Sequence, residues 1–229
     1  MVYAIIFDMD GVVIDSNPYH KIGWTRFLNS KGVEVNEEIF KNLIFGTTGD
    51  EALKILLQKD LSQKEIDNYS YEIDEEYRNI IRQLSCVNPV AGLVEFLESI
   101  KLSGHKIALA TSAPSENVDL ILNKLGIYEF FDLIVDKTQI LRGKPNPEIY
   151  NTTVSKLSVE KGNCVVFEDS ISGIVSARGA GITVIGVETS HSRDELIQAG
   201  ASLTIQDFTG LTIADITELI TDKSIKKQW

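Results

Sequence analysis

Residues 3–13 read YAIIFDMDGVV, an apolar run followed by two aspartates and a glycine. A short apolar run that ends at a turn signal is typical of a buried strand. Asp8 and Asp10 would then lie close together at the carboxyl end of that strand. Two like charges at this spacing repel each other, so such a pair usually needs a cation or a shared proton. An exposed turn with two aspartates fits the same letters, and the rest of the chain has to distinguish the two interpretations.

The composition narrows the class of protein. The chain has 229 residues, 43% of them hydrophobic and 24% charged, which is typical of a globular protein with one domain or a domain and a smaller partner. The formal net charge of -11 argues against a nucleic-acid partner. We see no apolar run near the roughly 20 residues of a membrane span and no secretory signal. Cys86 and Cys164 lack the spacing of a metal site, so we expect two reduced thiols in a cytoplasmic protein. We also expect no binding to membranes. The sequence does not indicate the oligomeric state.

The first long segment after the aspartates has a helical pattern. Two stretches, residues 48–51 (TGDE) and 62–65 (SQKE), have the pattern of a capping box. Behind the second one, apolar residues recur every three or four positions from Ile66 to Leu84, which predicts a long amphipathic helix with one buried stripe. We therefore expect residues 16–86 to form an all-helical domain inserted after the first strand.

After Asn88-Pro89 the pattern changes to short apolar runs separated by helical segments. The predicted strands are 106–110, 133–135, 164–167, 183–187 and, at one edge, 203–205. The predicted helices are 93–101, a helix ending at Leu125, one starting at Asn146-Pro147, 171–180, and one opening at Ser192. Alternation with short links predicts a parallel sheet covered on both faces. The expected fold class is α/β, a Rossmann-like parallel sheet core of residues 1–15 and 87–229 with the helical domain inserted.

Polar residues gather where the predicted strands end. Ligands of open α/β sheets bind beyond the carboxyl ends of the strands. The residues found there are Asp8, Asp10, Thr111, Ser112, Lys144 (in the segment RGKP at 142–145), Glu168, Asp169 and Ser170. Four carboxylates, a hydroxyl and an ammonium suit a divalent metal and a phosphate. Mg²⁺ prefers oxygen ligands, so we expect it to bind Asp8 and Asp169, with Glu168 behind them and the Asp10 backbone carbonyl as a further ligand.

The same residues support a phosphoryl-transfer mechanism. An aspartate can attack phosphorus to give an aspartyl-phosphate, and a second acid can protonate the leaving oxygen and then deprotonate water. Asp8 fits the nucleophile and Asp10 the acid and base. The Thr111 hydroxyl can hold phosphoryl oxygens, and Lys144 can neutralise the nucleophile and the transferring group.

Four motifs occur in order along the chain: DMDGVVIDS at 8–16, Thr111 in ALATSAP, Lys144 in GKPNP, and EDSISGI at 168–174. Together they resemble the haloacid dehalogenase superfamily of phosphotransferases over nearly the whole chain. The resemblance implies that the helical segment is a cap domain that closes over the active site. It also implies that an aspartate at position 10 belongs to the phosphatase and phosphomutase type rather than the dehalogenase type.

Within that superfamily the chain is most similar to the β-phosphoglucomutase-like group. The likeness is carried by Tyr19-His20 and Trp24 in the first cap helix and by the loop FGTTG at 45–49. It implies that the substrate contacts are Thr111, Ser112, Lys144, His20, Trp24, Gly46 and Thr47. From the residues alone, His20 fits a half-buried helix position better than a pocket position, and the family resemblance makes the two equal. Trp24 lies on the apolar stripe of its helix, which favours a core position.

The cap loop differs from that of the sugar phosphomutases. In those enzymes a lysine precedes the loop glycine and an arginine follows shortly after, whereas this chain has Phe45 and Gly49 there. A mutase must grip a second phosphate, which a cation normally does. We therefore predict a Mg²⁺-dependent phosphatase of small phosphorylated metabolites, of the sugar or polyol phosphate kind. The alternatives are a β-phosphoglucomutase-type enzyme and a module that binds metal or phosphate without turnover.

Overall fold

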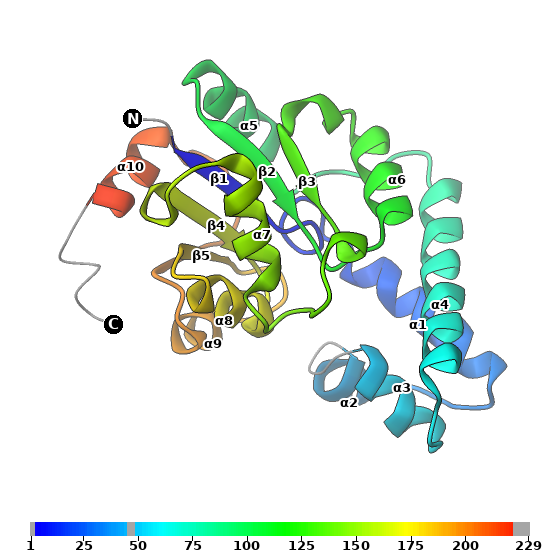
Figure 1. Ribbon diagram of the computed structural model, residues 1–229. Coiled ribbons are helices and arrows are strands. Elements are labelled where there is room, and N and C mark those ends of the chain that lie inside the picture. The colour runs from blue at the N-terminus through cyan, green and yellow to red at the C-terminus, as the bar shows by residue number, and fades with distance from the viewer. Residues whose placement is uncertain (1–2, 45–48, 222–229) are drawn as a thin grey trace. The chain divides into compact units, whose positions relative to one another are not determined.

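A computed structural model describes residues 3–44 and 49–221 of the chain (Figure 1). The described chain folds into two compact units, one made of Met1–Asp15 and Val87–Trp229, the other of Ser16–Cys86. We call the first the core unit and the second the helical unit. Phe45, Gly46 and Thr47, three of the loop residues singled out above, lie outside the described residues, as does Thr48 of the first predicted capping box.

The core unit contains a parallel sheet. Within the described residues its six strands have the order β3-β2-β1-β4-β5-β6, and all neighbouring strands run parallel. The strands are β1 (Ala4–Phe7), β2 (Lys106–Ala110), β3 (Leu133–Val135), β4 (Cys164–Glu168), β5 (Thr183–Val187) and β6 (Leu203–Ile205). The predicted α/β fold class is therefore confirmed. Strand β4 is one residue longer than predicted because Glu168 pairs in register with Gly186 of β5.

Helices surround this sheet. They are α5 (Leu93–Leu102), α6 (Ser115–Leu125), α7 (Glu148–Leu157), α8 (Ile171–Gly179), α9 (Arg193–Ala199) and α10 (Ile213–Thr221), with short 3₁₀ turns η2 (Tyr128–Phe130), η3 (Lys137–Gln139) and η4 (Lys161–Asn163). Helix α9 opens with the expected capping box between Ser192 and Glu195. Helix α7 begins at Glu148, directly after the predicted start at Asn146-Pro147, and Asn146 Oδ1 accepts a hydrogen bond from the Glu148 N–H of its first turn at 3.0 Å.

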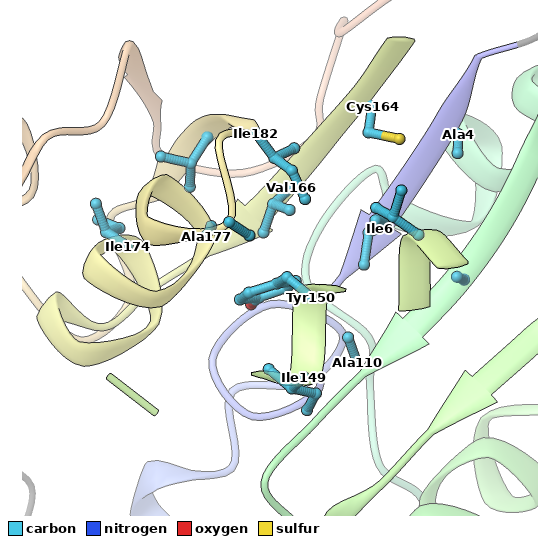
Figure 2. Packing of buried hydrophobic residues seen from close by; sticks show 14 of the residues in the cluster. Ala4, Ile6, Ala110, Ile149, Tyr150, Cys164, Val166, Ile174, Ala177 and Ile182 are labelled. Atoms are coloured by element: carbon cyan, nitrogen blue, oxygen red, sulfur yellow. The ribbon is translucent and has the colours of Figure 1, made fainter. Parts of the chain in front are cut away.

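The sheet is apolar on both faces, as a parallel sheet requires. On one face, Ala4 and Ile6 of β1 and Val166 of β4 pack against helices α7, α8 and α9. Figure 2 shows Ile6, Val166 and Tyr150 gathered in this cluster. On the other face, Phe7 stacks on Phe167 with ring centroids 5.2 Å apart. Strand β1 is consequently buried along its whole length, and the residues that follow it are held in a fixed place.

The helical unit has its own apolar core. Its elements are α1 (Asn17–Ser30), α2 (Glu37–Ile39), the π-helical turn η1 (Phe40–Ile44), α3 (Gly49–Leu57) and α4 (Gln63–Gln83). Trp24, Phe27 and Leu28 of α1 pack with Leu53 of α3 in this core. The capping box predicted at Ser62 is confirmed. Four residues of the predicted stripe are buried in α4, and two further residues are buried beside them: Ile66, Ile73, Tyr77 and Ile80, with Arg78 and Ile81. No helix among residues 3–44 and 49–221 is both long enough and apolar enough to cross a bilayer.

The two connections between the units lie side by side in the core unit. The Val90 N–H donates a 3.0 Å hydrogen bond to the Val13 carbonyl, so the chain leaves and re-enters the core at neighbouring points. Both valines are buried. The helical unit is thus inserted without interrupting the sheet.

The two cysteines are free thiols in different environments. Cys86 is exposed and Cys164 is buried in β4. Burial raises the pKa of the Cys164 thiol to about 11, so this thiol stays protonated at neutral pH and is a weak nucleophile.

Candidate active site

The turn after β1 positions the first aspartate. The Asp8 N–H continues the sheet by donating to the Phe167 carbonyl at 3.0 Å. The chain then turns sharply, with the Val13 N–H donating to Met9 O at 2.8 Å and the Gly11 N–H to Ile14 O at 2.7 Å. Gly11 adopts φ of +75° in this turn, a conformation that favours glycine. Asp8 is thereby buried at the carboxyl end of the central strand.

The structure brings three predicted carboxylates together. Among the described residues, Asp8, Glu168 and Asp169 offer oxygen atoms that all lie within 4.8 Å of one another, close enough to hold one metal ion. Burial raises the pKa of Asp8 to about 7, although Lys144 acts in the opposite direction. Burial also raises the pKa of Asp169 well above its ordinary value, and the charges of Glu168 and Asp8 add to the effect. The raised pKa values indicate that the positive charge near Asp8 and Asp169 does not offset the cost of burying their ionised forms.

Lys144 lies between two of these carboxylates. Its Nζ donates to Asp8 Oδ1 at 2.8 Å and to Glu168 Oε1 at 2.6 Å, with its side chain only 7% exposed. Burial lowers the pKa of Lys144, but the two carboxylates raise it above its ordinary value, so the ammonium stays charged. A weaker contact of 3.4 Å joins Nζ to the Ala110 carbonyl, at the end of β2.

The other predicted residues of the core unit lie at the same strand ends. Thr111 directly follows β2 and is buried, and its Oγ1 accepts a hydrogen bond from the Ala113 N–H at 3.1 Å. Ser112 is exposed beside it. Asp10 is half-buried in the turn after β1, where its backbone bridges to Ile14. The metal, catalytic and substrate roles predicted for these residues stay predictions.

This arrangement joins three clustered carboxylates, close enough to hold one metal ion, to a buried ammonium at the carboxyl ends of parallel strands. A model of the haloacid dehalogenase-like hydrolases matches residues 5–187, which include every one of these side chains. The chain belongs to this family. The predicted resemblance is thus confirmed.

Several members of the haloacid dehalogenase-like hydrolases are similar to the chain along most of its length. A Thermotoga maritima protein described as a phosphorylated carbohydrates phosphatase is 36% identical over 200 residues, covering 86% of this chain and 91% of its own. A β-phosphoglucomutase of Bacillus subtilis is 28% identical over 215 residues, covering 92% of each chain. The crystal structure of a family IA, variant 3 hydrolase from Entamoeba histolytica has a TM-score of 0.90 and 31% identity, covering 96% of this chain and 100% of that one.

The structure adds site residues that sequence reasoning missed. The Tyr150 hydroxyl donates a hydrogen bond to Glu168 Oε1 at 2.6 Å, and Ser190 Oγ contacts Asp169 Oδ2. His191 Nδ1 lies 3.0 Å from the Asp169 carbonyl. Tyr150 lies three residues after the GKPNP motif, but its place on α7 is that of an ordinary core residue, so its pattern does not indicate the contact with Glu168. The segment 188–192 has no signal either, because only the sheet order brings it beside β4.

Two of the predicted substrate contacts, His20 and Trp24, make aromatic contacts within the helical unit. Trp24 is buried with its ring edge against Phe27, and His20 stacks on Tyr77 with ring centroids 4.1 Å apart. Gly46 and Thr47 lie outside the described residues. The substrate roles of these four residues stay predictions.

Proposed function

We propose that this protein is a Mg²⁺-dependent phosphatase of small phosphorylated metabolites, of the sugar or polyol phosphate kind, which works through an aspartyl-phosphate on Asp8. The observation that carries the proposal is the buried group of Asp8, Glu168 and Asp169 joined to Lys144. The phosphatase class itself, with a phosphomutase as the other possibility, is supported by the relatives and by the family match. The substrate class rests on the Thermotoga maritima relative, whose name refers to phosphorylated carbohydrates.

The donor set fits Mg²⁺. When all three carboxylates are ionised, the single Lys144 ammonium leaves the group with two unbalanced negative charges in a buried place. Asp8 and Asp169 would hold the ion through carboxylate oxygens, with Glu168 and the Asp10 carbonyl as further oxygen donors. When bound, the ion supplies positive charge that offsets the repulsion between these carboxylates and the phosphoryl oxygens.

Asp8 carries out the first step of the proposed reaction. One of its oxygens attacks phosphorus, so an oxygen–phosphorus bond forms on Asp8 while the bond from phosphorus to the leaving alcohol breaks. Asp10 gives its proton to the leaving oxygen, and the alcohol departs neutral. Thr111 and Ser112 hold the phosphoryl oxygens in place during this step. Lys144 places its charge beside the oxygen of Asp8 that it contacts at 2.8 Å.

Asp10 also carries out the second step. As a carboxylate, it takes a proton from a water molecule, which attacks the phosphorus of the aspartyl-phosphate. The bond to Asp8 breaks, inorganic phosphate leaves, and both aspartates return to their starting states. The two steps therefore require one aspartate that bonds to phosphorus and a separate one that exchanges protons.

The proposal is tested by a panel of hexose, pentose and polyol phosphates, assayed for phosphate release with Mg²⁺ present. We expect Asp10→Asn to lower turnover by about 100-fold or more while the Mg²⁺-induced rise in unfolding temperature stays within a few degrees of wild type. An unchanged rate in this variant contradicts the role of Asp10. A wild type that releases no phosphate from any compound favours the binding module instead.

A phosphomutase is the second candidate, because the Bacillus subtilis relative is a β-phosphoglucomutase. The sequence favours the phosphatase, since Phe45 and Gly49 stand where a mutase has cations. The same panel separates the two. Conversion of glucose 1-phosphate to an isomer without phosphate release would overturn the phosphatase.

A further inference from the structure

Tyr150 of helix α7 is a buried polar residue that the proposed reaction does not use. Its ring is fully enclosed in the apolar cluster with Ile6, Ile149 and Val166 (Figure 2). Its hydroxyl reaches out of this cluster and donates a 2.6 Å hydrogen bond to Glu168 Oε1. A phenylalanine would fill the cluster as well, so packing alone does not account for the hydroxyl.

The oxygen that Tyr150 contacts is also the oxygen that holds Lys144. The Lys144 ammonium lies 2.6 Å from Glu168 Oε1 and 5.3 Å from the centroid of the Tyr150 ring. The other oxygen, Glu168 Oε2, accepts from the backbone N–H groups of Asp169 at 3.2 Å and Ser170 at 3.3 Å, and from Ser170 Oγ at 3.1 Å. The orientation of the Glu168 carboxylate is therefore set from both sides.

We propose that Tyr150 is a positioning residue for the catalytic lysine: it occupies one side of Glu168 Oε1 and so directs Lys144 toward Asp8. The inference rests on the proposed function, because it concerns the same reaction. It assigns a role to a hydroxyl that touches neither the substrate nor the nucleophile.

The geometry supports this role through the limited capacity of one oxygen. A carboxylate oxygen has about two lone-pair directions, and the Tyr150 hydroxyl takes one of them. Lys144 has a flexible four-carbon side chain, so its ammonium can rotate to any free acceptor. The Tyr150 hydroxyl occupies one side of Glu168 Oε1, and the Tyr150 ring centroid lies 5.3 Å from Nζ. Nζ therefore stays on the side from which it reaches Asp8 Oδ1 at 2.8 Å. Asp8 then keeps its other oxygen for the attack on phosphorus.

The first test compares Tyr150→Phe with the wild type on the best phosphate ester of the panel. Removing the hydroxyl should lower kcat by about 10-fold, the lower end of what such supporting contacts contribute, and leave KM within about 2-fold. Tyr128→Phe is the matched control, because the Tyr128 hydroxyl also bonds a carboxylate, that of Asp119, and belongs to η2 ahead of β3. Its kcat should stay within about 2-fold of wild type.

A second test asks whether Tyr150 acts through Lys144. In a Lys144→Gln background, Tyr150→Phe should cost less than about 2-fold in residual kcat, because the group it positions is already absent. Losses that multiply in the double variant would contradict the proposal. So would a Tyr150→Phe enzyme as active as wild type, or one that loses its cooperative unfolding transition, which would make the hydroxyl purely structural. A wild type without phosphatase activity contradicts the proposed function, whereas an active wild type with an equally active Tyr150→Phe contradicts this inference alone.

Discussion

Two glycines leave room for two of the carboxylates at the site. A Cβ atom at Gly11 would lie 1.8 Å from Asp169 Oδ2, and one at Gly173 would lie 1.9 Å from Glu168 Oε1. Both carboxylates therefore pack directly against backbone. A close approach of this kind keeps water away from the far side of each carboxylate, which strengthens its interactions with cations.

Gly11→Ala tests this packing. The new methyl group must displace Asp169, and a shift of about 1 Å in such a group can cost about 100-fold in rate, so we expect at least that loss of phosphatase turnover. Gly210→Ala is the control, because Gly210 has the same φ of +75° and no described atom lies within 4 Å of its Cβ position. It should lose about 1–2 kcal/mol of stability, seen by thermal unfolding, and keep its turnover. Equal losses of turnover in both variants would show that backbone strain, not the contact with Asp169, is responsible.

The loop after β5, residues 188–192, ties two parts of the site together. Thr189 Oγ1 donates to the Gly11 carbonyl at 2.6 Å, and Ser190 and His191 contact Asp169 through its side chain and its backbone. The loop thus links the turn after β1 to the acidic residue after β4. Its place follows from β5 lying next to β4 in the sheet.

Ser190→Ala measures what the loop contributes to metal binding. Losing the contact that orients Asp169 should weaken Mg²⁺ binding by about 10-fold, measured from the Mg²⁺ concentration that raises the unfolding temperature. Ser192→Ala is the control two residues away, because Ser192 caps α9 through Glu195. It should lower stability by about 1 kcal/mol and leave Mg²⁺ binding unchanged. Mg²⁺ binding that is the same in both variants would exclude a role for Ser190.

At the scale of the whole molecule, the core unit and the helical unit each have an apolar core of their own. The carboxylates, Lys144 and Tyr150 belong to the core unit, whereas Leu53 is fully buried in the core of the helical unit. Units with their own cores can open separately, each with its own free energy.

Leu53→Ala is expected to loosen one unit only. Deleting this buried side chain should cost about 2–5 kcal/mol and speed hydrogen exchange of amides in α1, α3 and α4. Exchange in β1 and β4, and the Mg²⁺-induced rise in their protection, should stay as in the wild type. Faster exchange throughout both units would show that the chain opens as one cooperative body.

Much of the fold could be predicted because the signals are local. The runs 106–110, 133–135 and 183–187 are mostly apolar, contain β-branched residues and are bounded by turn residues, and each is a strand with those bounds. The start of α7 was also predictable, because a cap residue before a proline marks it, and Asn146 indeed accepts a hydrogen bond from the Glu148 N–H of the first turn. The π-helical turn at Phe40–Ile44 had no sequence signal that we recognised.

The site was predictable where a residue follows a strand directly. Asp8, Thr111 and Asp169 do so, and Glu168 is the last residue of β4. Parallel strands bring their carboxyl ends to one edge of the sheet. Tyr150 and Ser190 were missed because each reaches the site from the side. Tyr150 reads from its helix as a core residue, and only the three-dimensional structure shows that its hydroxyl meets Glu168.

The hydrogen bond between Val90 and Val13 has a practical consequence for protein engineering. Because Val13 and Val90 lie side by side in the core unit, residues 16–86 form a long insertion whose two ends are held close together. Loop length costs little once its ends are pinned. A chimera that receives this segment from another family member, cut at the same two points, keeps every strand pairing of the sheet and the contact of Lys144 with Asp8, because all of these belong to the core unit.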